Sequence, residues 1–313
     1  MTLSNLKQSL LNRIVEWVRA NLFLERLLCD FCANSFLRDR LKFGAIAYHY
    51  LSSFEHPEWR VTRLDGCQFW VNIAEYQGLW LYFFREHQEP RSARLAAELI
   101  RAGDTCIDVG ANMGSYTFLM ASRVGDRGRV FAFEPQPNLY QKLLDSQQLN
   151  SLEKILSIDS RILYSKTGEK CKLFLSEDAR NSGMASTLCH GDFLKEYSFI
   201  ERETVTLSDY FQAQKLKSCD LLKVDVECAE MEVFQGAIDL FQQHRIRYLI
   251  VEQAAGSDSQ KLLQTWGYTG WYIDEYKTKL VALDETPKER FGNYLFVSPR
   301  ELVEFKHRYS HWL

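Results

Sequence analysis

The sequence predicts a doubly wound α/β fold, and three observations lead to this prediction. From residue 105 onward, short β-branched and aromatic runs alternate with segments of helical periodicity. A glycine-containing turn joins the first of these strands to the helix after it. The last two strand-like segments have no helix between them, which indicates a closing antiparallel pair. Because internal repeats and long Gly/Ser linkers are absent from the sequence, we expect one catalytic domain.

The expected elements can be placed along the chain from their hydrophobic periods. Strands are predicted at 105–109, 129–133, 155–163, 170–175, 220–225 and 246–252. Helices are predicted at 115–123, 137–149, 207–213, 230–240 and 258–265. The closing antiparallel pair falls near 269–273 and 293–298.

The segment before this alternation has a different pattern. Residues 1–57 carry apolar side chains at helical spacing, which predicts a helical extension. We interpret it as a cap packed on the main domain, with contact to a membrane surface and homodimer formation as the alternatives. Residues 58–313 form the predicted main domain, which begins with a hairpin that turns at Asp65-Gly66. A helix that starts near Pro90 and continues to residue 100 follows it.

Composition narrows the choice of partners. The chain has 313 residues, 46% of them hydrophobic, and a formal net charge of −3, so nucleic acid is not expected as the main partner. The eight cysteines are scattered, and we expect them to be reduced and to bind no metal. No run of eighteen apolar residues occurs, and Lys7, Arg13 and Glu16 interrupt any secretory signal. We therefore expect a cytoplasmic protein.

The most informative motif is the turn after the strand at 105–109. From Asp108 to Thr117 the chain reads Asp-Val-Gly-Ala-Asn-Met-Gly-Ser-Tyr-Thr. Gly110 and Gly114 permit positive φ and let a ligand approach the backbone. A dinucleotide-binding loop has the spacing G-x-G-x-x-G, and a carboxylate such as Asp108 at its mouth would repel the pyrophosphate. A cationic ligand fits better, and we expect S-adenosylmethionine, whose amino group and sulfonium are positive.

A second acidic residue supports this choice of ligand. Glu134 ends the strand at 129–133, just before Pro135. In an α/β unit the acidic residue at the end of the second strand accepts hydrogen bonds from ribose hydroxyls. The alternative is a plain βαβ unit with an exposed glutamate.

Two further carboxylates follow the strand at 220–225. Asp225 and Glu227 lie at its carboxyl end, where open α/β sheets bind their ligands. Two residues apart, they share a face on a continuing strand and are candidates for the base that removes a proton from an acceptor hydroxyl. Their alternative role is in capping and turn formation.

Two more residues are weaker candidates. His190 follows the loop at 181–183 and could act as a base, although it could equally be an exposed turn residue. Glu252 ends the strand at 246–252 at the same predicted edge, where it would position substrate or form an ion pair.

Together these stretches resemble the FkbM family of S-adenosylmethionine-dependent methyltransferases. The family pattern Asp-Val-Gly-Ala-Asn-x-Gly appears at 108–114 and Phe-Glu-Pro at 133–135. An Ala-Leu-Ser-Asp-like stretch with glycine falls at 162–168, Asn-Ser-Gly at 181–183, and Ile-Asp-Val-Glu-Gly-Ala-Glu at 224–230. The resemblance spans about residues 72–297 and leaves the first 55 residues outside. It implies a Rossmann-like class I methyltransferase sheet with a C-terminal antiparallel hairpin.

The resemblance also implies roles for individual residues. The methionine and backbone side of the cofactor would be lined by Asp108, Gly110, Asn112, Gly114 and Ser115. Thr117 would anchor the start of the helix, Glu134 would hold the ribose, and the adenine would lie against Ile162 and Leu163. A loop formed by Asn181, Ser182 and Gly183 would close over the substrate.

Two positions depart from the family pattern. Cys228 replaces the usual glycine after Asp-Val-Glu, and a cysteine is strained where a glycine adopts positive φ. Tyr164-Ser165 replaces the usual Ser-Asp.

The implied activity is O-methylation of a hydroxyl on a sugar, glycolipid or natural-product intermediate. The expected partner is thus a small-molecule, sugar or lipid-linked hydroxyl compound. A non-catalytic cofactor-binding or scaffold protein that acts through the N-terminal helices is the alternative. An NAD-dependent dehydrogenase would require the other glycine spacing.

Overall fold

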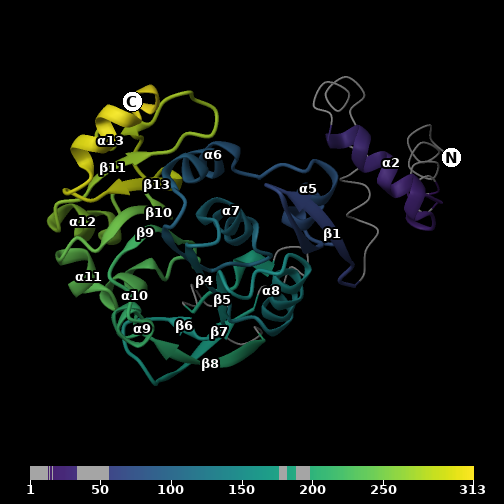
Figure 1. Ribbon diagram of the computed structural model, residues 1–313, viewed down its shortest axis with the longest axis horizontal. Coiled ribbons are helices and arrows are strands. Elements are labelled where there is room, and N and C mark those ends of the chain that lie inside the picture. Colours follow the sequence, from purple (N-terminus) through teal and green to yellow (C-terminus); the bar gives the residue numbers. More distant parts are fainter. Residues whose placement is uncertain (1–12, 14, 16, 34–55, 176–181, 188–197) are drawn as a thin grey trace.

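An eight-stranded sheet forms the centre of the computed structural model, which describes residues 13, 15, 17–33, 56–175, 182–187 and 198–313 (Figure 1). The strands have the order β12-β11-β13-β10-β9-β3-β4-β5. The five strands from β10 to β5 are parallel, whereas β13 pairs antiparallel with both β10 and β11. Their bounds are β3 Thr105–Val109, β4 Arg129–Phe133, β5 Leu156–Asp159, β9 Cys219–Val224, β10 Ile246–Ala254, β11 Thr269–Tyr272, β12 Val281–Ala282 and β13 Phe291–Val297.

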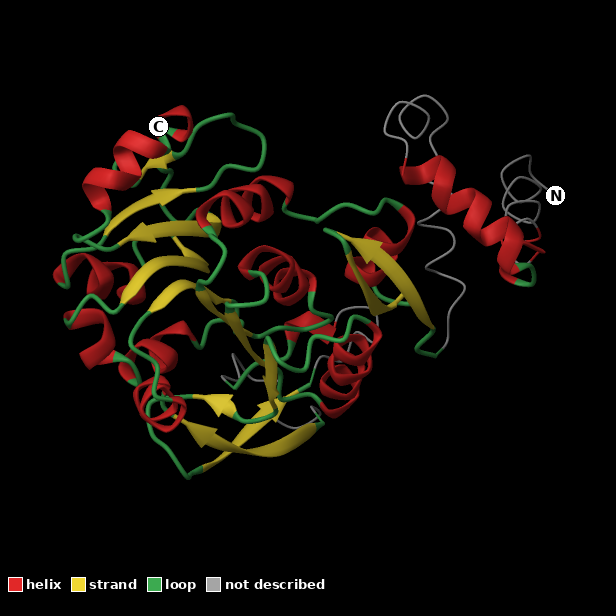
Figure 2. Cartoon of the chain, in the orientation of Figure 1, coloured by secondary structure: helices red, strands yellow, loops and turns green. Residues whose placement is uncertain are grey.

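Helices cover both faces of this sheet (Figure 2). One buried apolar cluster lies between the sheet and the first set of helices, α6 Pro90–Leu99, α7 Ser115–Val124, α8 Pro137–Leu149 and α13 Leu302–Arg308. A second cluster lies under the other set, α9 Leu207–Gln214, α10 Glu230–Gln235, α11 Ile238–Gln242 and α12 Asp258–Thr265. This layering buries the parallel strands on both faces, which explains why their sequences read as apolar runs. The predicted doubly wound fold with a C-terminal antiparallel part is confirmed.

Two predicted elements are each divided in the structure. The predicted strand at 155–163 is two strands, because Asp159 accepts hydrogen bonds from the backbone and side chain of Arg161 and the chain turns there. The predicted helix at 230–240 is interrupted at Gly236, whose position leaves no room for a Cβ beside the Tyr164 carbonyl. The second strand, β6 Ile162–Leu163, joins a small separate sheet with β8 Phe199–Val205 and β7 Lys170–Phe174.

The hairpin and the helix that follows it, residues 59–83, form a separate layer against α8. The hairpin of β1 Trp59–Leu64 and β2 Cys67–Asn72 is held there by Asn150, whose side chain bonds the backbone N–H and C=O of Gln68. The helix α5 Tyr76–Phe83, which the sequence analysis did not predict, follows the hairpin. The helix α2 Leu22–Ala33 packs on this layer through Glu25, which is buried and bound by Arg60 and Tyr82. Among the described residues, no helix is long and apolar enough to cross a membrane.

The strand order places a crevice at one edge of the sheet. The chain proceeds from β3 to β4 and β5 on one side, and then returns to form β9 and β10 on the other side. The loops after β3 and β9 therefore diverge at the carboxyl ends of two adjacent strands, which is where doubly wound folds bind ligands. Asp108 lies near the end of β3 and Asp225 directly after β9.

Candidate functional site

A cavity of about 250 Å³ opens at this crevice. Its walls come from the loops after β3, β4 and β9, from β10 at Glu252, from the turn between α5 and α6, and from β6. The predicted site residues that line it are Asp108, Gly110, Asn112, Ser115, Glu134, Ile162, Leu163, Gly183, Asp225, Glu227 and Glu252. The fold thus brings most of the predicted residues to one place.

The loop after β3 is shaped by close backbone contact. Gly110 has φ +81°, and a Cβ at this position would lie 1.9 Å from the carbonyl oxygen of Asp225. Asn112 also has positive φ, at +50°, and its buried side-chain oxygen has no hydrogen-bond partner in the described part of the chain. A buried carbonyl oxygen without a partner costs free energy, so a ligand that donates a hydrogen bond there would be favoured.

Asp108 is buried beneath this loop. Its carboxylate accepts a 2.5 Å hydrogen bond from the hydroxyl of Thr117, which is itself fully buried and does not line the cavity. Burial raises the pKa of Asp108 to about 6. Gly114, with φ +91°, lies outside the cavity lining, against Phe118. Thr117 and Gly114 therefore fix the position of Asp108 and of the helix.

Glu134 joins two of the loops that form the cavity. One carboxylate oxygen accepts from the backbone N–H of Asn112 at 2.8 Å, and the other accepts from the N–H of Gln136 at 2.9 Å. Burial raises the pKa of Glu134 to about 7. Beyond it, the far wall is formed by Ile162 and Leu163, next to Arg161.

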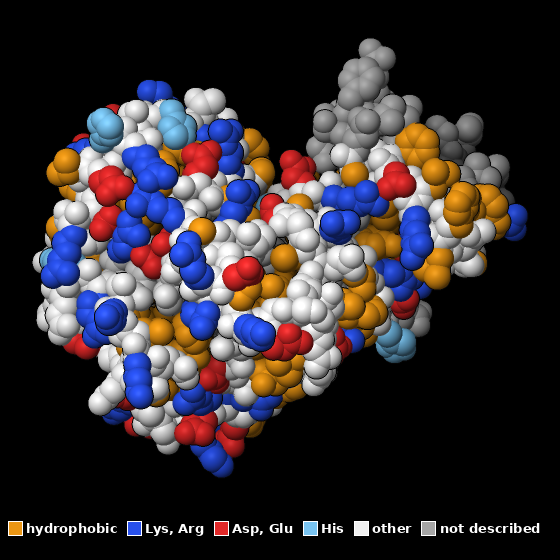
Figure 3. Space-filling view, in the orientation of Figure 1, with side chains coloured by type: hydrophobic (Ala, Val, Ile, Leu, Met, Phe, Trp, Pro, Cys, Tyr) orange, Lys and Arg blue, Asp and Glu red, His pale blue; other side chains and the backbone are white. Residues whose placement is uncertain are grey.

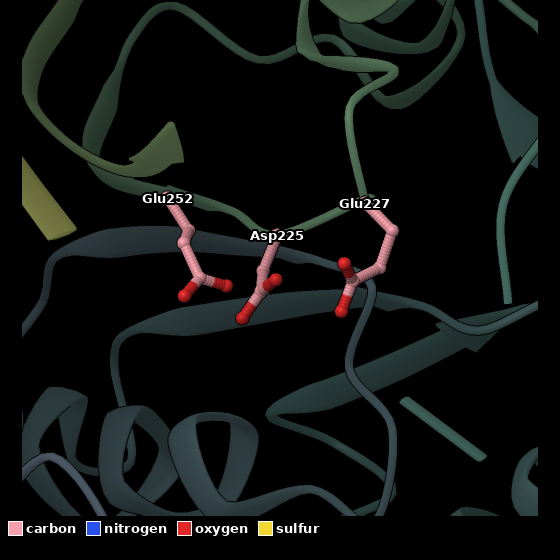
Figure 4. A group of neighbouring side chains, drawn as sticks. All are labelled: Asp225, Glu227 and Glu252. Atoms are coloured by element: carbon pink, nitrogen blue, oxygen red, sulfur yellow. The ribbon is translucent and has the colours of Figure 1, made fainter. Parts of the chain in front are cut away.

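Three carboxyl groups meet at the other end of the cavity (Figure 4). One oxygen each of Asp225, Glu227 and Glu252 lies within 4.8 Å of the others, and the three side chains project to the same side of the sheet edge. Lys223, which is buried in β9, places its ammonium 3.1 Å from Asp225. Carboxylate oxygens are common ligands of divalent cations. Here, however, the Lys223 ammonium already provides a positive charge beside one of the three carboxyl groups.

The protonation states of these groups follow from burial and from Lys223. Burial alone would raise the pKa of Asp225. The positive charge of Lys223 and the hydrogen bonds from Lys223 and Glu252 together have the larger opposite effect, so the pKa of Asp225 is lowered. Burial and the charge of Asp225 raise the pKa of Glu252 to about 9, so Glu252 is protonated at neutral pH. Burial and Asp225 raise the pKa of Glu227 to about 7. Glu227 is thus the carboxyl that exchanges its proton near neutral pH.

The backbone turns sharply after Asp225. Glu227 and Cys228 have φ values of +50° and +73°, both in the left-handed region. The strain expected where Cys228 replaces glycine is therefore confirmed in the backbone geometry. The backbone carbonyl of Glu227 accepts a hydrogen bond from the hydroxyl of Ser186 at 2.6 Å, which fixes this turn against the loop at 182–187.

The loop predicted to close over the substrate is described only in part. Asn181 and His190 lie outside the described residues. The backbone N–H of Ser182 donates to the buried Glu75 at 2.8 Å, and its carbonyl accepts from the Gln136 side chain. Ser182 itself is outside the cavity lining, whereas Gly183 lines it. Ser182 therefore holds the loop that Gly183 presents to the cavity.

Sequence reasoning missed several residues of the cavity wall. Lys223 lies within the apolar strand β9. The signal that could have identified it as a site residue is a charged side chain in an otherwise apolar, buried run. His87 and Glu89 precede α6 and line the cavity near Tyr116, whose hydroxyl lies 3.3 Å from Glu89. Neither residue belongs to a recognised motif. The sequence indicates them only through a short polar run, Glu-His-Gln-Glu, before Pro90.

Comparisons with known proteins bear on the identity of this chain. Over 169 residues it is 28% identical to the methyltransferase sdnD of Sordaria araneosa, covering 47% of this chain and 64% of that protein. Over 165 residues it is 26% identical to the hexuronic acid methyltransferase AglP of Haloferax volcanii, covering 53% and 62%. The chain thus spans less than two thirds of the length of these relatives.

Among solved structures, the model is similar to M. jannaschii TYW2 in complex with AdoMet. The TM-score is 0.41 at 11% sequence identity, over 78% of this chain and 87% of that chain. The family model described as the methyltransferase FkbM domain matches residues 108–283. Because this match covers more than half of the chain, the protein belongs to the FkbM family of S-adenosylmethionine-dependent methyltransferases.

Proposed function

We propose that this protein transfers a methyl group from S-adenosylmethionine to a hydroxyl of a sugar, glycolipid or natural-product intermediate. The observation that carries the proposal is the position of Glu227. Its carboxyl lies in the same cavity as the cofactor-binding loop, and its pKa of about 7 suits a base at neutral pH.

The chain's own residues support a fit to the cofactor. Asp108 and Glu134 present carboxyl groups that can accept hydrogen bonds from an ammonium and from ribose hydroxyls. Gly110 lets a ligand lie against the backbone, and the unpaired oxygen of Asn112 offers a further acceptor. Ile162 and Leu163 supply an apolar surface for the adenine.

The bound cofactor supplies an activated methyl group on a positively charged sulfur. A hydroxyl attacks such a carbon efficiently only when it is aligned and its proton is removed. Glu227, when ionised, would accept that proton. Asp225 is paired with Lys223, and the protonated Glu252 donates its hydrogen bond to Asp225, which keeps Asp225 in place. The three carboxyls thus take different roles in the proposed reaction.

A sugar acceptor is supported by one relative, the hexuronic acid methyltransferase AglP. The N-terminal helical region could place the enzyme near its acceptor through a membrane surface or a second copy of the chain. Hydrophobic side chains gather over α2 at one end of the molecule (Figure 3), where Trp17, Leu22, Phe23 and Leu27 are exposed. The face in this view mixes Lys and Arg with Asp and Glu, which does not favour a nucleic-acid partner.

The test is a methyl-transfer assay. The protein is incubated with methyl-labelled cofactor and a panel of glycans, glycolipids and natural-product intermediates, and products are examined for methyl groups on oxygen. We expect O-methyl products that persist with a metal chelator and disappear with Glu227→Gln. Label only on nitrogen would contradict the proposal. Cofactor binding without turnover on any acceptor class would favour the scaffold alternative.

A further inference from the structure

His87 has an arrangement that the proposed reaction does not use. It lies in the turn between α5 and α6, outside the family-matched residues 108–283, and lines the cavity while only 9% exposed. Its Nε2 lies 2.6 Å from a carboxylate oxygen of Asp65, the turn residue of the hairpin. Asp65 has φ +51°, so the hairpin turn itself aims this carboxylate.

The hydrogen bond to Asp65 leaves one ring nitrogen for a ligand. Because an ionised carboxylate only accepts hydrogen bonds, Nε2 must carry the proton in this pair. In the described part of the chain, Nδ1 has no hydrogen-bond partner. When the ring holds both protons, Nδ1 donates to an anion, and Asp65 balances the charge of the ring.

The cofactor brings one anionic group into an acidic cavity. Its methionyl end carries a carboxylate as well as an ammonium, and this carboxylate needs a donor. In the described part of the chain, six acidic side chains line the cavity: Glu89, Asp108, Glu134, Asp225, Glu227 and Glu252. An unpaired carboxylate beside them would be repelled, so the identity of its partner matters for affinity.

Among the described residues, three basic side chains line the same cavity, and two of them already pair with carboxylates. Lys223 is bound to Asp225, and the carboxyl groups of Glu89 and Glu252 also lie near it. Arg161 holds Asp159 through both Nε and Nη2, beside the apolar wall at Ile162. Arg161 Nη1 likewise has no hydrogen-bond partner in the described part of the chain, but Arg161 lies beside the wall expected to face the adenine. Since Lys223 is paired with Asp225, His87 is the described basic residue near α7 that can still bind a ligand.

The position of His87 also suits the methionyl end. Its ring centroid lies 5.9 Å from that of Tyr116, in the first turn of α7. The start of a ten-residue helix points free N–H groups and a partial positive charge at this side of the cavity. Ile162 and Glu134, where the adenine and ribose are expected, belong to the walls formed by β6 and by the loop after β4.

We propose that His87, oriented by Asp65, binds the methionyl carboxylate of S-adenosylmethionine. The proposal rests on the cofactor and not on the identity of the acceptor. It makes the hairpin and the α5–α6 turn part of the cofactor site, although both lie outside the family-matched residues.

Isothermal titration calorimetry with two ligands tests this role without any acceptor. S-Adenosylhomocysteine has the carboxylate, whereas 5′-methylthioadenosine lacks the whole amino-acid end. We expect His87→Gln to weaken the affinity for S-adenosylhomocysteine about tenfold or more and to leave the affinity for 5′-methylthioadenosine unchanged. Asp65→Asn should weaken only the affinity for S-adenosylhomocysteine, and by a smaller factor than His87→Gln does.

The matched control is His311→Gln. His311 also pairs with a carboxylate, Glu98, at 2.9 Å, but it is exposed and outside the cavity. This variant should bind both ligands as the parent protein does. Unchanged affinity of His87→Gln for S-adenosylhomocysteine, or an equal loss for both ligands, would overturn the proposal. If the parent protein bound neither ligand, the cofactor assignment would fail instead.

Discussion

The ammonium of Lys223 lies 3.1 Å from the carboxylate of Asp225, two residues further along the same strand edge. This pair determines how the neighbouring carboxyls behave. Asp225 remains ionised because of Lys223, and burial together with the negative charge of Asp225 raises the pKa of Glu252 and Glu227. A lysine within an apolar strand thereby separates three similar side chains into an anion, a neutral acid and a group that titrates near pH 7.

Replacing Lys223 by methionine should destabilise the protein. The substitution leaves Asp225 without its counter-ion, and breaking a fully buried pair costs about 3–5 kcal/mol. Because the Asp225 side chain is 34% exposed, we expect the free energy of unfolding to fall by about 2 kcal/mol. Urea denaturation at pH 7 measures this loss. The double variant Lys223→Met with Asp225→Asn should recover most of this loss. If the double variant were less stable than the single one, the pair would not be the cause.

Replacing Glu227 by glutamine should lower turnover about a hundredfold or more, since the amide cannot accept the proton. Cofactor affinity, measured by calorimetry, should be retained. In the parent protein kcat should rise with pH through about 7, because the ionised carboxyl is the active base. Equal loss of kcat and cofactor affinity would indicate a binding role for Glu227.

Cofactor affinity should depend on pH through Glu134. The pKa of this carboxyl is raised to about 7, so it is largely protonated at pH 6 and ionised at pH 8. Ribose hydroxyls donate more strongly to the ionised form, and affinity should therefore increase by up to about tenfold over this range. Glu134→Gln should bind more weakly and lose most of the dependence. A pH profile identical in both proteins would argue against ribose binding by Glu134.

Alanine at Gly110 should abolish cofactor binding and destabilise the fold. Its Cβ would collide with the backbone carbonyl of Asp225 at 1.9 Å. Gly66 is the matched control, since it has a similar φ of +86° but no atom within 4 Å of the added Cβ. Gly66→Ala should cost only about 1 kcal/mol from backbone strain. Equal unfolding free energies for the two variants would show that the contact with Asp225 is unimportant.

Glycine at Cys228 should stabilise the protein by about 1 kcal/mol, because it removes the strain of a side chain at φ +73°. Thermal unfolding of both forms measures this difference. Turnover should change less than twofold, since the Cys228 N–H that bonds Glu230 is retained. A lower melting temperature for the variant would mean that the cysteine makes compensating contacts.

Sequence periodicity predicted the parallel sheet because buried strands such as β3 and β4 are mostly apolar and are followed closely by glycine or proline. The position of Asp108 and Gly110 in the cavity wall was predictable for a related reason, since these residues carry both the backbone geometry and the charge. Breaks within elements were not predictable in this way. The turn at Asp159 and Arg161 depends on side-chain hydrogen bonds that no hydrophobic period records.

The rest of the site depends on contacts between segments distant in sequence. His87, which lines the cavity, is held by Asp65 from the hairpin turn. The buried charge of Lys223 is tolerated only because carboxyls from β9 and β10 and from the α5–α6 turn surround it. A pattern of single residues could not indicate either arrangement, because the partners lie on different elements.

The central claim is that the acidic cavity at the sheet edge binds S-adenosylmethionine through Asp108 and Glu134. Calorimetric titration of the cofactor into the parent protein and into Asp108→Asn with Glu134→Gln tests it most directly. We expect one molecule bound per chain, and an affinity at least about tenfold weaker in the double variant. Unchanged affinity in the double variant, or no binding to the parent protein, would contradict it.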